Sequence, residues 1–131
     1  MIAHPMSVTT AGFFMSTEPY ILITNQSPAE IGAAVRRALS EGKVGIRTPR
    51  RDEYPNLPSS PVQRKMREYR GARTVRITQD EELVLLPHLN GGGAGPNRGY
   101  HELPLKKIAL PMTIDDAALG AACFEALARC E

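Results

Sequence analysis

The sequence predicts an α/β protein of the α+β type: one compact domain with a mixed central sheet of about five strands, helices packed on that sheet, and a repeated strand–helix unit at each end. Three observations support this prediction. Two similar segments lie near the chain ends, at residues 20–43 and 108–131. Between them, β-rich runs flank a short polar turn at residues 79–81, which is typical of a hairpin. The length of 131 residues, with 42% hydrophobic and 23% charged residues, suits a single globular domain.

The repeat aligns without a gap when the first segment is shifted by 88 positions, which pairs Ser27 with Asp115. Seven of the 24 aligned pairs are identical, and Gly32 with Gly120 is one of them. Ser27 and Asp115 are both residue types that cap a helix N-terminus, and an apolar stripe spaced i, i+3, i+4, i+7 follows each. Glycine inside a helix costs roughly 1 kcal/mol relative to alanine. A glycine at the same register in both copies therefore indicates that two backbones approach closely there.

The first half of the chain divides into an arm, one repeat unit and a proline-rich segment. Residues 1–18 show no period and are expected to form an irregular N-terminal arm, so that the domain comprises residues 19–131. The first repeat unit is expected to form a strand at about 20–24, a helix at about 28–41 and a further strand at 44–47. Four prolines within residues 49–61 exclude regular structure. Ser60-Pro61 is typical of the start of a short helix over 62–70.

The second half is expected to be mostly strand before a final helix. The hairpin is expected to consist of strands over 73–78 and 82–86. A glycine-rich connection then precedes a weak strand at 100–105. The second repeat unit is expected to supply a strand at 107–110 and a helix at about 116–130.

No pattern in the sequence predicts catalysis. The cluster from Gly91 to Gly95 is followed by proline and strand-like residues, whereas a phosphate-binding loop continues with Gly-Lys-Ser/Thr and opens a helix. We therefore expect a mobile connection between strands at this point. The three histidines and two cysteines lack the paired spacing of a zinc site, and Cys123 lies on the apolar stripe of the last helix. We expect no enzymatic activity, no cofactor and no metal.

The sequence also shows no membrane-spanning segment and no signal peptide. No apolar run approaches the roughly 18 residues of a membrane span, and the N-terminus lacks the positively charged start of a signal peptide. Cys123 and Cys130 lie seven residues apart on one expected helix, or roughly 10.5 Å along its axis. This separation is too large for a disulfide. We therefore expect a cytoplasmic protein that binds no membrane.

The strongest polar feature is the middle of the chain. Residues 47–76 contain nine basic and three acidic residues, and eight of the nine basic residues are arginine. The planar guanidinium of arginine suits bidentate contacts to carboxylate or phosphate. Three interpretations stay open: a solvated face, a surface for an acidic protein partner, and a nucleic-acid-binding module. Arginine and tyrosine dominate protein-binding hot spots. The residues expected to contact a partner are Arg50, Arg51, Tyr54, Arg64, Arg67, Tyr69, Arg70 and Arg98.

The repeated segments SPAEIGAAVRRAL (27–39) and DDAALGAACFEAL (115–127), each after a short strand and with a hairpin between them, resemble the immunity proteins of bacterial contact-dependent growth inhibition systems. The resemblance covers residues 20–131, and the two helical segments are its distinctive part. Ala118 departs from it, because the family pattern has glutamate there.

The resemblance implies a cytoplasmic α/β protein without catalysis of its own. Such a protein would bind the C-terminal toxin domain of a secreted effector, commonly a nuclease, in a 1:1 complex. The matching positions are structural, so the resemblance assigns no binding residue. The alternative function is a nucleic-acid-binding module that uses residues 47–76.

Overall fold

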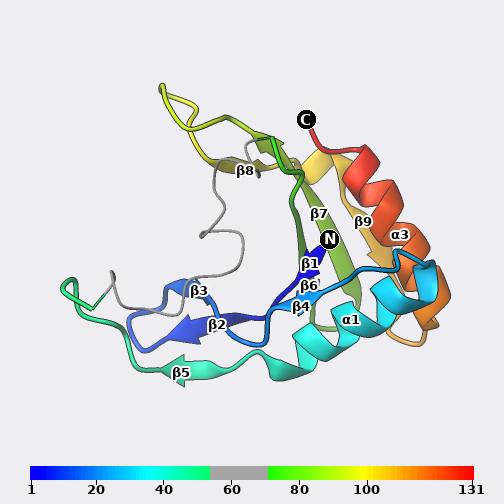
Figure 1. The fold of residues 1–131 in the computed structure, drawn as a ribbon, viewed down its shortest axis with the longest axis horizontal. Coiled ribbons are helices and arrows are strands. Elements are labelled where there is room, and N and C mark those ends of the chain that lie inside the picture. The colour runs from blue at the N-terminus through cyan, green and yellow to red at the C-terminus, as the bar shows by residue number, and fades with distance from the viewer. Residues whose placement is uncertain (54–70) are drawn as a thin grey trace.

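The structure is a computed structural model, and it describes residues 1–53 and 71–131. Two helices pack against each other and cover one side of an antiparallel sheet (Figure 1). The helices are α1 (Pro28–Glu41) and α3 (Asp116–Ala128), and η2 (Pro104–Lys106) is a single 3₁₀ turn. The strands are β1 (Ile2–Ala3), β2 (Met6–Thr9), β3 (Phe14–Ser16), β4 (Ile21–Leu22), β5 (Val44–Ile46), β6 (Val75–Gln79), β7 (Leu83–Asn90), β8 (Tyr100–Glu102) and β9 (Ile108–Leu110). This is the α+β class that the sequence predicts.

The two helices begin in the same way. The Ser27 hydroxyl accepts a hydrogen bond from the backbone N–H of Glu30 at 3.3 Å, and the Asp115 carboxylate accepts one from Ala118 at 2.7 Å. The shift of 88 positions pairs these residues with each other. Each bond satisfies a first-turn N–H that has no partner within the helix. The starts of both helices are therefore where the sequence predicts them.

The repeated glycines form the contact between the helices. A Cβ atom on Gly32 would overlap the carbonyl oxygen of Asp116, and one on Gly120 would overlap the carbonyl oxygen of Pro28. Pro28 and Asp116 are the first residues of α1 and α3 and are themselves a repeat pair. The contact is therefore reciprocal, which is the pattern of an internal pseudo-twofold axis. The prediction of close backbone approach at these glycines is confirmed.

One ion pair departs from this symmetry. The Nε atom of Arg36 donates to the Asp116 carboxylate at 2.7 Å, and its Nη2 atom donates to the carbonyl oxygen of Ile114. The repeat partner of Arg36 is Phe124, which cannot form such a pair. The ion pair is partly exposed, so we expect it to contribute at most about 1 kcal/mol.

Strand β7 organises the sheet beneath the helices. Its residues Leu83–Leu85 pair with both β6 and β9, and its last three residues pair with β8. Leu83 and Leu85 are fully buried and pack with Ile31 of α1 and Leu119 of α3. The end of the chain returns to this strand, because the N–H of Asn90 donates to the carbonyl oxygen of Glu131 at 2.7 Å.

The strand arrangement differs from the prediction in two ways. In place of one mixed sheet of about five strands, residues 1–53 and 71–131 form three sheets: β1-β4, β3-β2-β5, and β7 with β6, β8 and β9. Residues 1–18, expected to be irregular, contain β1, β2 and β3. These strands are two to four residues long, and a period of two needs about four to eight residues to be recognised. Their pairing is decided by distant residues, such as Val44 for Val8.

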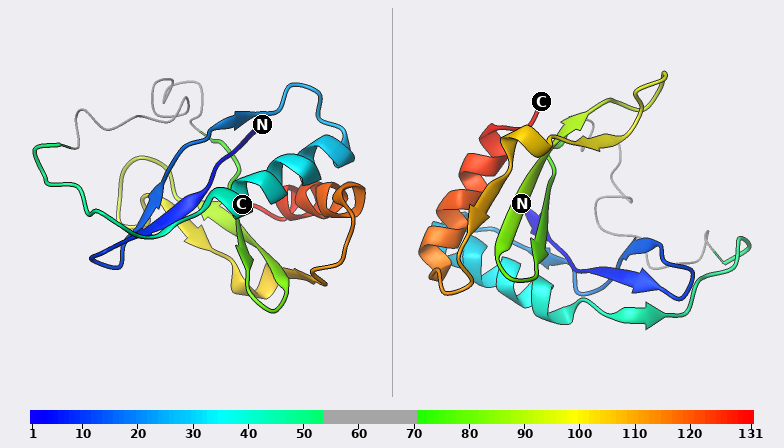
Figure 2. Two further views of the ribbon diagram at one scale, coloured as in Figure 1. Left: turned by 90° about the horizontal axis from the view of Figure 1, so that it is seen from below. Right: turned by 180° about the vertical axis from the view of Figure 1, so that it is seen from behind.

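Two parts of the molecule extend from the body toward the same end. The β3-β2-β5 sheet, hereafter the small sheet, extends from the C-terminal end of α1, and the β7–β8 hairpin extends from the far end of β7 (Figure 1). Figure 2 shows the same arrangement from below and from behind. These two extensions carry the described residues of the predicted binding surface.

Candidate functional site

The structure describes three of the eight residues predicted to contact a partner. Arg50 and Arg51 are exposed in the segment after β5, and Arg98 is exposed in the loop between β7 and β8. These segments lie at the ends of the two separate extensions in Figure 1. The described residues therefore do not form one continuous arginine cluster. Tyr54, Arg64, Arg67, Tyr69 and Arg70 lie outside the described residues, as does the helix expected over 62–70.

The glycine cluster connects two strands, as predicted. Asn90 pairs with Tyr100 across the hairpin, and the N–H of Gly91 donates to the carbonyl oxygen of Gly99 at 2.8 Å. A side chain on Gly91 would overlap the carbonyl oxygen of Asn97. The glycine at this position thus allows the hairpin to close on itself. The cluster opens no helix, so the helix N-terminus of a phosphate-binding loop is missing.

Two arginines of the basic middle are held by carboxylates. Arg47 donates two hydrogen bonds to Glu53, at 2.9 and 2.8 Å, and the backbone N–H of Arg50 donates to the same carboxylate at 2.5 Å. The bond from Arg47, followed by the one from Arg50, lowers the pKa of Glu53, and the bond to Glu53 raises the pKa of Arg47. Arg76 pairs with Glu102 at 2.7 Å. The local charge is therefore less positive than the count of arginines suggests.

Arg76 also connects the two extensions. Its guanidinium carbon lies 4.7 Å from the centre of the Phe14 ring, while the same group pairs with Glu102 of β8. A cation above an aromatic ring is attracted by the negative face of that ring. One side chain of β6 thus contacts both the small sheet and the β7–β8 hairpin.

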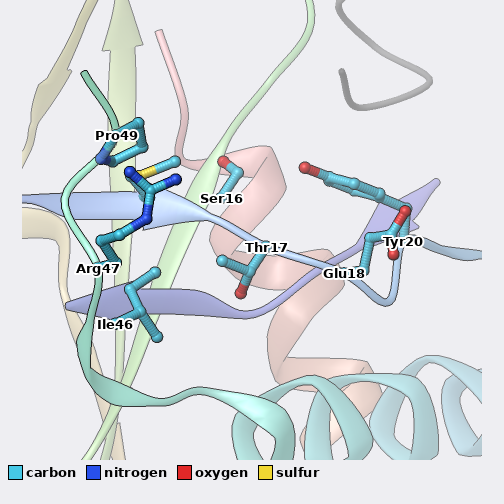
Figure 3. A pocket seen from close by; sticks show the side chains of 8 residues that line it. Ser16, Thr17, Glu18, Tyr20, Ile46, Arg47 and Pro49 are labelled. Carbon is cyan, nitrogen blue, oxygen red and sulfur yellow. The ribbon is translucent and has the colours of Figure 1, made fainter. Parts of the chain in front are cut away.

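A shallow cleft of about 280 Å³ lies beside the small sheet. Figure 3 shows Arg47 and Pro49 at one end of it and Glu18 and Tyr20 at the other. Burial, together with the nearby Glu18 carboxylate, raises the pKa of Tyr20. The other lining residues are Met15, Ser16, Thr17 and Ile46. The lining offers a phenol, a carboxylate and an arginine that Glu53 holds, which suits the binding of a partner side chain.

The small sheet has an unusual distribution of polar and apolar residues. Ser7 and Thr9 are only 1% and 3% exposed. On the opposite face the register aligns Val8 with Phe14 and with Val44, and Phe14 and Val44 are 56% and 86% exposed. A sheet with one buried face normally turns its apolar residues inward.

We call this outward surface, formed by Met6, Val8, Phe14 and Val44, the apolar face. Exposed apolar surface that is gathered in one place commonly marks an interaction site. Sequence reasoning missed it, because the alternation in residues 6–9 does not show which side is buried.

Within residues 1–53 and 71–131, no group of three or more histidine, cysteine or acidic residues is placed to hold a metal ion. In the same ranges, none of the helices has the length and apolarity needed to cross a membrane. Cys123 and Cys130 are both buried free thiols.

Comparisons with known proteins support the fold. No family model matches the chain, and no curated protein matches it. Among solved structures, the protein of unknown function NMB0488 from Neisseria meningitidis is similar, with a TM-score of 0.67 and 14% sequence identity. The match covers 99% of this chain and 88% of that protein. At this level of identity the similarity establishes the fold and carries no information about activity.

Proposed function

We propose that this chain is a cytoplasmic immunity protein that binds and neutralises the C-terminal toxin domain of a contact-dependent growth inhibition effector. It acts by forming a stable 1:1 complex and has no catalytic activity of its own. The resemblance of the two repeated helical segments supports this proposal. The observation that carries it is the apolar face beside the exposed Arg50 and Arg51. Protein interfaces combine an apolar centre with a polar rim, and arginine is enriched in them.

A nucleic-acid-binding module is the second candidate, favoured by the basic composition of residues 47–76. Such a surface gains its affinity from cations that neutralise phosphates. Glu53 and Glu102 already hold Arg47 and Arg76, and the small sheet next to this segment exposes apolar side chains. These features favour a protein partner.

The charge of the segment suggests which part of the toxin it contacts. If the toxin is a nuclease, its substrate groove is basic, and like charges would oppose Arg50 and Arg51 there. We expect these arginines to meet acidic residues of the toxin, either catalytic carboxylates or an acidic patch beside the active site. Arginine suits this contact because it can bind a carboxylate with two parallel hydrogen bonds.

Co-expression tests the proposal directly. Cells that produce the toxin domain encoded beside this chain should survive when the chain is also produced, and titration calorimetry should give a stoichiometry of one. Binding to duplex DNA and to RNA of arbitrary sequence, at 50 and 200 mM salt, is the comparison. Failure to rescue, together with nucleic-acid affinity that falls steeply with salt, would favour the second candidate.

A further inference from the structure

We infer that the apolar face is the centre of the toxin interface, and that the toxin covers it with apolar side chains bordered by carboxylates. This inference rests on the proposed function and locates the contact. The centre of the interface is then formed by Met6, Val8, Phe14 and Val44, and not by the arginine-rich segment. Arg50 and Arg51 lie at its rim.

The two buried hydroxyls on the inward face of the small sheet, those of Ser7 and Thr9, both have hydrogen-bond partners. The Ser7 hydroxyl bonds to the Thr17 hydroxyl at 2.8 Å and accepts from the N–H of Lys43 at 3.1 Å. The Thr9 hydroxyl accepts from the N–H of Phe13 at 3.0 Å. Buried hydroxyls with partners are stable where they are. Specific bonds therefore hold Ser7 and Thr9 inward, on the face that also carries Met15, the register partner of Ser7.

The register of the strands decides which side chains of the small sheet face outward. Moving one strand by a single residue would turn its apolar residues inward, because the side-chain period of a strand is two. That change would break the bonds of Ser7 and Thr9. The present register is the one that keeps these bonds and leaves Phe14 and Val44 exposed. The outward position of the apolar residues is thus specified by the fold.

The charged residues that border the apolar face indicate the chemistry of the partner. Lys43, Arg50 and Arg51 are exposed along one edge of the small sheet, and the acidic residues that follow them are Asp52 and Glu53, of which Glu53 is already paired with Arg47. On the same face, Arg76 lies over Phe14. A partner with an acidic rim complements this border. A second copy would bring the same cations against themselves, because a twofold interface joins identical patches.

The experiment uses two matched double variants and the toxin domain encoded beside this chain. F14S/V44S makes the apolar face polar. L22S/L105S removes two exposed apolar side chains from β4 and η2, outside the small sheet. We expect F14S/V44S to raise the Kd for the toxin domain about 100-fold, because truncating central interface residues gives the largest losses of binding. L22S/L105S should bind within about threefold of the wild type, since surface changes away from an interface have small effects.

Circular dichroism and the urea midpoint show whether F14S/V44S is folded. If it is not, V44S alone decides the question, because Val44 is 86% exposed and its loss leaves the core unchanged. This single variant should then weaken binding about tenfold.

Other outcomes of these measurements would contradict the proposed interface or the proposed function. If the wild type and F14S/V44S bind equally well, the interface lies elsewhere and the proposed function stands. If the wild type does not bind the toxin domain, the function and this inference both fail. A dimer that F14S/V44S dissolves would assign the apolar face to a second copy. Binding to phosphatidylserine vesicles that F14S/V44S abolishes would assign it to a membrane surface. Either result would overturn the inference.

Discussion

The helix pair with β7 and the small sheet place their apolar residues in opposite ways. In the first region Ile31, Leu83 and Leu119 are fully buried. In the small sheet, the hydroxyls of Ser7 and Thr9 are buried while Phe14 and Val44 are exposed. The first region therefore obtains its stability from its own apolar contacts. The second is held by hydrogen bonds and leaves apolar side chains exposed.

Backbone hydrogen bonds join β2 to β5 and to the residue before it within the small sheet, and β5 follows α1 along the chain. The N–H of Val8 donates to the carbonyl oxygen of Lys43, and that of Thr10 to Ile46, each at 2.8 Å. Lys43 follows α1 closely in the sequence. The position of the apolar face therefore depends on the helix pair, although the helix pair has no need of the apolar face. The following predictions test this one-way dependence.

The largest effect is expected when equivalent apolar groups are removed from the two regions. Ile31→Ala should lower the free energy of unfolding by about 2–5 kcal/mol, because it leaves a cavity in a close-packed core. Val44→Ala should change it by less than about 0.5 kcal/mol, as for an ordinary surface position. Urea denaturation measures both values. Equal losses would mean that Val44 is part of the core and that the two regions do not differ.

A side chain added at the helix contact should have the next largest effect. Gly32→Leu should cost roughly 1–3 kcal/mol, because the side chain would overlap the Asp116 carbonyl and force the helices apart. Gly93→Ala is the control, since its Cβ would meet no atom within 4 Å. The two thermal midpoints should separate clearly. An unchanged midpoint for Gly32→Leu would show that the helices do not meet there.

Reversal of charge beside the apolar face should affect binding and not stability. We expect R50E/R51E to slow association with the toxin domain about tenfold, and less at high salt, because rim charges act mainly by steering. Arg37→Glu, at an exposed position of α1, is the matched charge control. Stopped-flow association rates at two salt concentrations measure the effect. If R50E/R51E associates like the wild type, the arginines are solvated surface.

The smallest effect should come from Cys123. Burial raises the pKa of its thiol from 9.0 to about 11. The neutral thiol contributes fully to stability below pH 9, and this contribution is lost as the pH rises toward 11, because only the unfolded chain ionises readily in that range. At pH 9.5 the loss should be about 1 kcal/mol. The free energy of unfolding of the wild type and of Cys123→Ala, measured from pH 8 to 10, isolates this loss of stability. Fast labelling of native Cys123 at pH 8 would contradict its burial.

Local signals in the sequence were enough to predict the helix pair. Ser27 and Asp115 begin the helices through bonds to residues three positions away, and Gly32 and Gly120 marked the contact because glycine is costly elsewhere in a helix. The hairpin of β6 and β7 was also predictable, since its turn is local. All of these signals act within a few residues. They can therefore be read without knowledge of the rest of the fold.

The strand pairing of the small sheet and the ion pairs around it could not be predicted, because they depend on contacts between distant parts of the chain. The Ser7 hydroxyl meets the Lys43 backbone, and Arg76 meets Glu102, in both cases across a long stretch of chain. Strands of three or four residues carry too little pattern to predict such partners. Alternation shows that a strand has two faces, but contacts from residues distant in the sequence decide which face is buried, as Thr17 and Lys43 do for Ser7. For that reason the arginine-rich segment was visible in the sequence, and the apolar face beside it was not.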